Sequence, residues 1–178
     1  MYETIPSRSN KKSQYISILL LIGAFAVMLF SAIPDLPFHS VIQFMSLALL
    51  TVSIFMMTRY ILCSYSYAVI HADDGKLDLT VSEIKRKSRI TVCRIGLVGI
   101  ESVTLVKSTD KELSENLKAN GKGRKSFNYC IDLAPAQYIH ILAEECGQRI
   151  VLKLSYDEKL FSILSDASLR NSSESTES

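Results

Sequence analysis

Hydrophobic residues in this chain form two uncharged runs, followed by a region of short alternating segments. The first run, Tyr15 to Ile33, holds 19 residues without a charge. At a helical rise of 1.5 Å it spans about 28 Å, close to the hydrocarbon thickness of a bilayer. The second run, Val41 to Leu62, contains one charge, Arg59, whose long side chain can reach an interface. We predict two transmembrane helices, at 15–33 and 41–62, joined as a hairpin by a short connection with two prolines.

Basic residues predict how this hairpin is oriented. Lys11 and Lys12 precede the first span, Arg59 and Tyr60 close the second, and the connection has no Lys or Arg. Lys and Arg near a span tend to stay in the cytoplasm, and Tyr is enriched at membrane interfaces. These four residues are therefore predicted interface anchors of a two-span plasma-membrane protein with both termini, including residues 1–14, in the cytoplasm. The competing interpretation is a cleaved signal peptide whose apolar core is 15–30.

Beyond the second span, runs rich in Val, Ile, Thr and Tyr recur about every ten residues and indicate β-strands. The run Asp73–Lys76 contains Asp-Gly and predicts a hairpin turn. Ile84 breaks the preceding alternation, which a bulge near Ser82 and Glu83 would restore. Polar residues 107–126 predict an exposed, mobile loop with one helical turn around Glu112 to Lys118. We expect seven antiparallel strands, at about 65–72, 77–84, 90–95, 100–106, 127–133, 138–143 and 149–155.

The end of the chain predicts one amphipathic helix. Ser155 and Glu158 have the spacing of a capping box. Apolar residues then recur at helical spacing, at Leu160, Ile163, Leu164 and Ala167. Residues 170–178, rich in Ser and Glu, predict a disordered, solvated tail.

Seven short strands and a closing helix, all within 65–169, resemble a pleckstrin-homology-like (PH-like) domain of the kind found in small bacterial membrane proteins. The resemblance rests on the runs 65–69, 94–103 and 149–154. It implies a partly open barrel of two packed sheets, plugged at one end by the helix. It also implies recognition of a lipid headgroup or a protein, without chemistry.

Two basic segments are candidate contacts for anionic lipid or for an acidic partner. Phosphoinositide binders of this family carry basic residues in the first hairpin turn, where this chain has Asp73 and Asp74. These carboxylates would repel a phosphorylated headgroup. The basic clusters lie later, at Lys85, Arg86, Lys87 and Arg89, and at Lys122, Arg124 and Lys125. The alternative is a charged turn and a charged loop that are simply solvated.

Composition argues against several other classes of protein. The formal net charge is +2, with 20 Lys and Arg against 18 Asp and Glu, which does not favour nucleic-acid binding. The four Cys form no CxxC pair, and the three His are far apart in sequence, so we expect no metal and no cofactor. His140 and Cys146 lack the spacing that a nucleophile and its base require.

We therefore expect a membrane-anchored, non-catalytic interaction or assembly module whose protein partner the sequence does not identify. Binding of anionic headgroups by the same domain is the alternative, and an enzyme is the third interpretation. The sequence leaves open whether the hairpin forms a homo-oligomer.

Overall fold

The computed structural model describes residues 2–7, 12–33, 38–72, 75–85, 88–145 and 147–174. The chain divides into two compact units, one of residues 10–63 and one formed jointly by residues 1–9 and 64–178. The second unit is therefore built from residues that precede the first unit in the sequence and residues that follow it. Residues 2–4 of the N-terminal segment 1–14 form a strand of this second unit.

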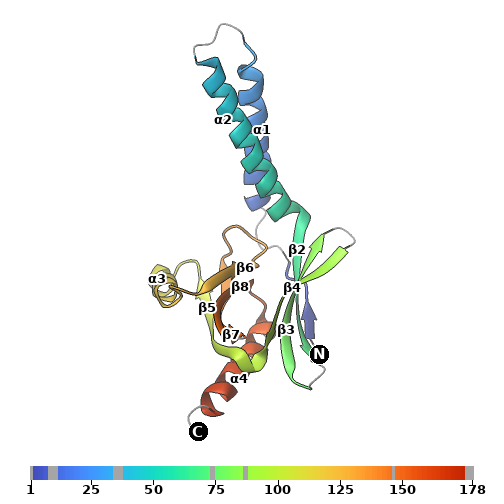
Figure 1. Cartoon of the computed structure of the whole chain (residues 1–178), viewed down its shortest axis with the longest axis vertical. Helices are drawn as coiled ribbons and strands as arrows, with labels where there is room; N and C mark the ends of the chain where they lie inside the picture. The colour runs from blue at the N-terminus through green and yellow to red at the C-terminus, as the bar shows by residue number, and fades with distance from the viewer. Residues whose placement is uncertain are drawn as a thin grey trace. The chain divides into compact units, whose positions relative to one another are not determined.

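The first unit is a helical hairpin of α1 (Lys12–Phe30) and α2 (His39–Met57), extended by a π-helical turn, η1 (Thr58–Leu62). The two helices lie side by side in Figure 1. Residues 13–30 and 40–62 are long and apolar enough to cross a membrane, with mean hydropathies of 2.1 and 2.0. The two predicted apolar helices are confirmed, within three residues at each end.

Small residues are the buried ones within this hairpin. Besides Ser13, they recur every seven residues, at Ser17 and Ala24 in α1, at Ser31 just after it, and at Ser46 and Ser53 in α2. Small side chains let helix backbones approach closely in an apolar medium. Each of the four serine hydroxyls in this seven-residue series donates to a backbone carbonyl three or four residues earlier, at 2.7–2.8 Å. None of these four buried hydroxyls is therefore without a partner.

The second unit contains two four-stranded sheets. Sheet A has the order β1-β2-β3-β4, and sheet B has the order β5-β7-β8-β6. The strands of sheet A are β1 (Tyr2–Thr4), β2 (Cys63–His71), β3 (Leu77–Lys85) and β4 (Ser88–Gly96). Those of sheet B are β5 (Ile100–Lys107), β6 (Lys125–Asn128), β7 (Gln137–Glu145) and β8 (Gln148–Ser155). The 3-10 turn η2 (Leu97–Gly99) connects the sheets.

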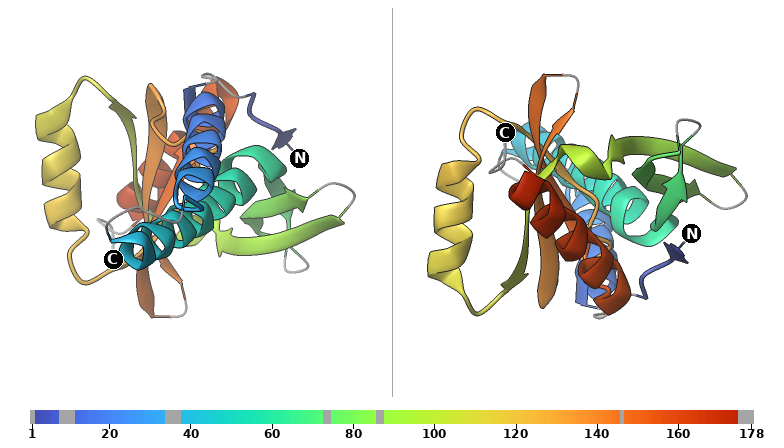
Figure 2. Two further views of the ribbon diagram at one scale, coloured as in Figure 1. Left: turned by 90° about the horizontal axis from the view of Figure 1, so that it is seen from above. Right: turned by 90° about the horizontal axis from the view of Figure 1, so that it is seen from below.

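The core lies between the inner faces of these sheets. Every second residue of β2 and β3, such as Tyr67 and Val81, belongs to the apolar core, as do Ile141 and Leu152 of sheet B. The residues between them, such as Ser66 and Ser82, are also buried but lie outside this core. This period of two explains the alternation in the sequence. Helix α4 (Glu158–Glu174) packs along β5 and adds Leu160 and Leu164 to the core. Figure 2 shows α4 from below.

Several local predictions are confirmed. The seven strands expected after the second span are present, and β2 and β3 meet at the expected turn, where Ala72 N donates to Lys76 O at 2.7 Å. Gly75 adopts a φ of 79°, which explains the Asp-Gly sequence. A register shift does fall between Val81 and Ser82, but the bulge predicted near Ser82 and Glu83 of β3 was placed on the wrong strand. The extra residue belongs to the partner strand, where Val92 has no counterpart in β3.

Other expectations were wrong. Residues 107–126, expected to be a loop, contain the ten-residue helix α3 (Lys111–Asn120), whose residues are mostly good helix formers. The sixth predicted strand is shorter, at Lys125–Asn128, and pairs with β8 in parallel rather than antiparallel. Helix α4 continues to Glu174, so residues 170–174 are helical, and 175–178 lie outside the described residues. The described strands form two sheets and no closed barrel.

Candidate interaction surface

One end of sheet A gathers three segments of chain. Thr4 of β1 pairs with Tyr67 of β2 in antiparallel fashion, so the chain leaves β1 in the direction of the start of β2. The β2–β3 turn lies at the opposite end of these strands. The last residues of β3 therefore lie beside the first residues of β2. Lys85 pairs with Ser88 as the last pair before the β3–β4 tip. We call this end, with the exit of β1, the start of β2 and the β3–β4 tip, the junction end, because both covalent connections to the helical hairpin leave from it.

A cluster of ionic and hydrogen bonds crosses sheet A near the junction end. The Arg89 guanidinium lies 2.6 Å from Glu3 Oε1 and donates to Ser66 Oγ at 3.1 Å. The Ser66 hydroxyl donates to the same Glu3 oxygen at 2.9 Å. These bonds, first from Ser66 and then from Arg89, lower the pKa of the Glu3 carboxyl. The cluster therefore fastens strand β1 to β2 and β4.

The two described basic residues of the β3–β4 tip, Lys85 and Arg89, are each paired with a carboxylate. Arg89 pairs with Glu3, and Lys85 Nζ lies 3.2 Å from Glu83 Oε1. Arg86 and Lys87 lie outside the described residues. An arginine already paired with a carboxylate has less to gain from a lipid phosphate.

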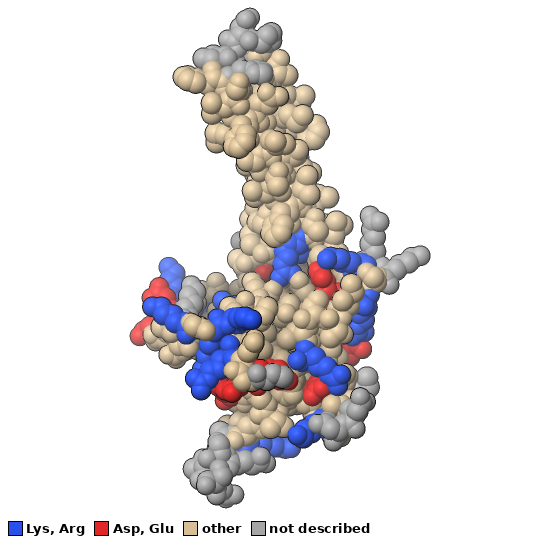
Figure 3. Space-filling view, in the orientation of Figure 1, with Lys and Arg blue, Asp and Glu red and all other residues tan. Residues whose placement is uncertain are grey.

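In the second predicted basic segment, Arg124 is paired with a carboxylate, whereas Lys125 contacts a neutral amide. Arg124 lies 2.9 Å from Glu101, and Lys125 Nζ lies 3.3 Å from the side-chain oxygen of Gln148, while Lys122 is exposed. In Figures 1 and 2, the segment that follows α3 lies on the opposite side of the domain from the β3–β4 tip. The structure therefore does not bring the two basic segments together. On the face shown in Figure 3, Lys and Arg are interspersed with Asp and Glu.

Asp157 is a second fastening point for β1, a role that local sequence pattern does not reveal because β1 is more than 150 residues away. Its carboxylate accepts the hydroxyls of Tyr2 at 2.6 Å and Thr4 at 3.1 Å. It also accepts the backbone N–H of Leu160 at 2.9 Å, which makes it the N-cap of α4. The predicted capping box at Ser155 is therefore wrong. Ser155 Oγ instead accepts the N–H of Ile131.

We predict that Asp157→Ala releases β1 and lowers domain stability by about 2–3 kcal/mol at neutral pH, the sum of a lost cap and two lost hydrogen bonds. Partial burial opposes ionisation of Asp157, but its hydrogen bonds, led by Tyr2, lower its pKa below the ordinary 3.8. The stabilisation is therefore present above pH 3.8 and disappears as the pH falls through the lower folded-state pKa. Unfolding of the purified protein against pH measures both effects.

Asp157→Asn is the matched control for this prediction, because Asn can still cap a helix but cannot be charged. It should retain part of the stability and lose the part of the acid dependence that comes from Asp157, while the part that comes from Glu3 remains. Equal stability of Asp157→Ala and the unaltered protein at neutral pH would contradict the role assigned to Asp157.

The predicted interface anchors lie at the ends of the hairpin helices. Arg59 and Tyr60 are in η1, with the Arg59 guanidinium 6.0 Å from the Tyr60 ring centre. Lys12 is the first residue of α1, and Lys11 lies outside the described residues.

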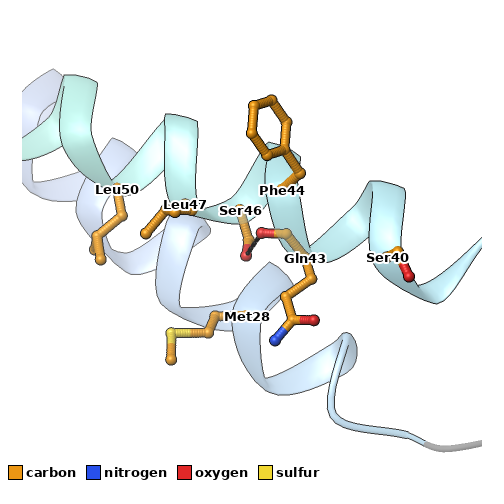
Figure 4. A pocket seen from close by; sticks show the side chains of 7 residues that line it. All are labelled: Met28, Ser40, Gln43, Phe44, Ser46, Leu47 and Leu50. Atoms are coloured by element: carbon orange, nitrogen blue, oxygen red, sulfur yellow. Dashed lines mark hydrogen bonds between the residues drawn. The ribbon is translucent and has the colours of Figure 1, made fainter.

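A groove of about 400 Å³ lies on the helical hairpin. Figure 4 shows Gln43 and Met28 at this groove, with Ser46 Oγ donating to the Gln43 carbonyl at 2.8 Å. Its walls are mainly apolar, so it suits an apolar chain better than a polar ligand. It is lined by Met28, Ser40, Gln43, Phe44, Ser46, Leu47 and Leu50.

Among the groups considered for chemistry, His140 is buried in β7, where its Nδ1 has no hydrogen-bond partner. Burial, with a smaller contribution from Lys153, lowers its pKa to about 4. Cys146 lies outside the described residues, so its distance from His140 is not defined. Within the described part of the chain, no three His, Cys, Asp or Glu side chains form a group that could hold a metal ion.

Comparisons of this chain with models of protein families, with curated proteins and with solved structures found no match.

Proposed function

We propose that this protein is a membrane-anchored, non-catalytic interaction module. In this proposal the α1–α2 hairpin spans the plasma membrane twice, and the β domain binds a protein partner at the cytoplasmic face. The observation that carries the proposal is the pairing of β1 with β2. β1 precedes the hairpin in the sequence and β2 follows it. The β domain is therefore covalently connected to both ends of the hairpin.

The same pairing supports the proposed topology. Strands that share a sheet must lie on one side of a membrane, and two spans return the chain to its starting side. The Lys and Arg residues flank the ends of the hairpin and are absent from its connection, which favours the cytoplasm for the β domain.

We also interpret the β domain as PH-like. Two packed sheets and a closing C-terminal helix support this interpretation. The strand taken from the N-terminus and the parallel pairing of β6 with β8 are departures from the expected pattern of seven antiparallel strands.

Headgroup binding by the two basic segments has less support. Arg89 and Arg124 are each bonded to a carboxylate, and the two segments lie apart on the domain. Surface charges that are already paired attract an anionic bilayer less than isolated ones do. A protein partner is therefore the better-supported ligand.

Cysteine accessibility in intact cells tests the anchored topology. With the four native cysteines replaced, Phe38→Cys in the hairpin connection should react with an impermeant maleimide from outside the cell. Lys122→Cys in the β domain should react only after permeabilisation, and the protein should stay with the membrane in alkaline carbonate. Extraction by carbonate, or labelling of Lys122→Cys from outside, would overturn the proposal.

A further inference from the structure

The four edges of the two sheets are not equally protected. β1 and β6 are short edge strands of three and four residues. β5 is packed by α4, where Asn171 donates to the carbonyls of Leu97 and Ile100 at 2.8 and 3.1 Å. β4 is nine residues long, and among the described strands it pairs only with β3. β4 is therefore the long open edge of this fold.

The half of β4 nearest the junction end is exposed over its whole length. Ser88 to Val92 are all exposed, and the side chains of Ile90 and Val92 are 57% and 38% accessible. In an antiparallel pair, every second residue of an edge strand directs both its N–H and its C=O away from its neighbour. An edge with free backbone groups and exposed apolar side chains is a template for another strand.

Edge strands are usually protected by charged side chains that project beside them. Here the side chains of both arginines of β4 lie over the face of sheet A, where they contact residues of the neighbouring strands. Arg94 Nε lies 2.6 Å from Asp78 Oδ2 of β3, and Arg89 reaches Glu3 of β1 and Ser66 of β2. These contacts hold the guanidinium groups away from the open side of β4. The bulge at Val92 separates Ser88–Thr91 from the rest of the strand, so the accessible part is short.

We propose that residues 88–92 of β4 are a docking edge for an extended, acidic segment of a partner protein, which adds a fifth strand to sheet A. This inference rests on the proposed function and names its binding surface. Backbone hydrogen bonds to a sheet edge supply affinity in this mode, and side-chain contacts supply specificity. Here Ile90 and Val92 offer the apolar contacts.

Charge selects the occupant. The β3–β4 hairpin, 77–96, carries five Lys and Arg residues against two Asp and Glu residues. Three of the five, Lys85, Arg89 and Arg94, are paired with carboxylates, and the formal charge is still +2 when Glu3, the partner of Arg89, is included. An acidic segment is attracted to this hairpin, whereas a second copy of β4 would bring two hairpins of the same positive charge together. The partner segment should therefore alternate acidic residues with β-branched apolar ones, which favour an extended conformation.

The test uses the full-length protein in nanodiscs of neutral phosphatidylcholine. The probe is a blocked eight-residue peptide in which glutamate alternates with valine, and backbone hydrogen exchange is the measurement. We expect the peptide to slow exchange at 88–92. The double substitution Ile90→Asp and Val92→Asp should weaken binding at least tenfold. Val98→Asp, at a side chain that is 64% exposed outside β4, is the matched control and should bind normally.

A second peptide with proline at two central positions lacks the N–H donors that strand pairing needs, and it should not bind. Equal binding of this peptide, or slowed exchange only at 121–125, would overturn the proposal. So would slow exchange at 88–92 without peptide in nanodiscs of anionic lipid but not of neutral lipid, because lipid would then cover the edge. None of these results alters the cysteine labelling that tests the anchored topology.

Discussion

Replacing residues 8–63 with Asn-Gly is expected to convert the chain into a soluble, folded protein. If the β1–β2 pairing is extended past Thr4 and Tyr67 in the same register, Ser7 lies opposite Ser64. A two-residue Asn-Gly loop is a preferred connection for such a pair. The apolar helices that would hold the chain in a membrane are removed, while both sheets and α4 are retained.

The matched control is the fragment 64–178, which has the same globular core but no β1. It loses the Tyr2 and Thr4 bonds to Asp157 and the Arg89 pair with Glu3. At about 1 kcal/mol for each bond, the fragment should be about 2–3 kcal/mol less stable than the turn-linked protein. Chemical denaturation of both proteins measures this difference. Aggregation of the turn-linked protein, or equal stability of the two, would contradict the role of β1.

Gly99→Ala is expected to be the most damaging small substitution in the β domain. A Cβ at this position would overlap the backbone carbonyl oxygen of Glu144 in β7. Strand β7 is held by β5 on one side and β8 on the other, so its backbone has little freedom to move. Overpacking of this kind typically costs about 1–3 kcal/mol, and a backbone clash belongs at the upper end. Thermal unfolding of the purified full-length protein measures the loss.

Gly96→Ala is the control for this substitution, three residues earlier in the same connection. Its Cβ would meet the Asp78 side chain at 3.7 Å, an ordinary contact. We expect a change below about 1 kcal/mol, as for most substitutions without a packing defect. Equal unfolding temperatures for Gly99→Ala and Gly96→Ala would show that the β5–β7 corner is more adaptable than this packing implies.

The candidate surface was only partly predictable. The sequence located the basic β3–β4 tip, but it did not indicate that Arg89 is paired with Glu3, 86 residues away. Such a pair depends on β1 and β2 becoming neighbours, and a three-residue strand is too short to show alternation. The open edge at β4 depends equally on strand order, which local pattern does not encode.

The sequence by itself determined the two apolar helices, the seven strands that follow them, the Asp-Gly turn and the closing helix. Each depends on periodicity or on a residue's own backbone preference, and both operate over a few neighbouring residues. The tertiary structure decided that β1 joins sheet A, that β6 runs parallel to β8 and that Asp157 caps α4 while it holds β1. These features join residues far apart in the chain, and their energy exists only once the sheets have formed.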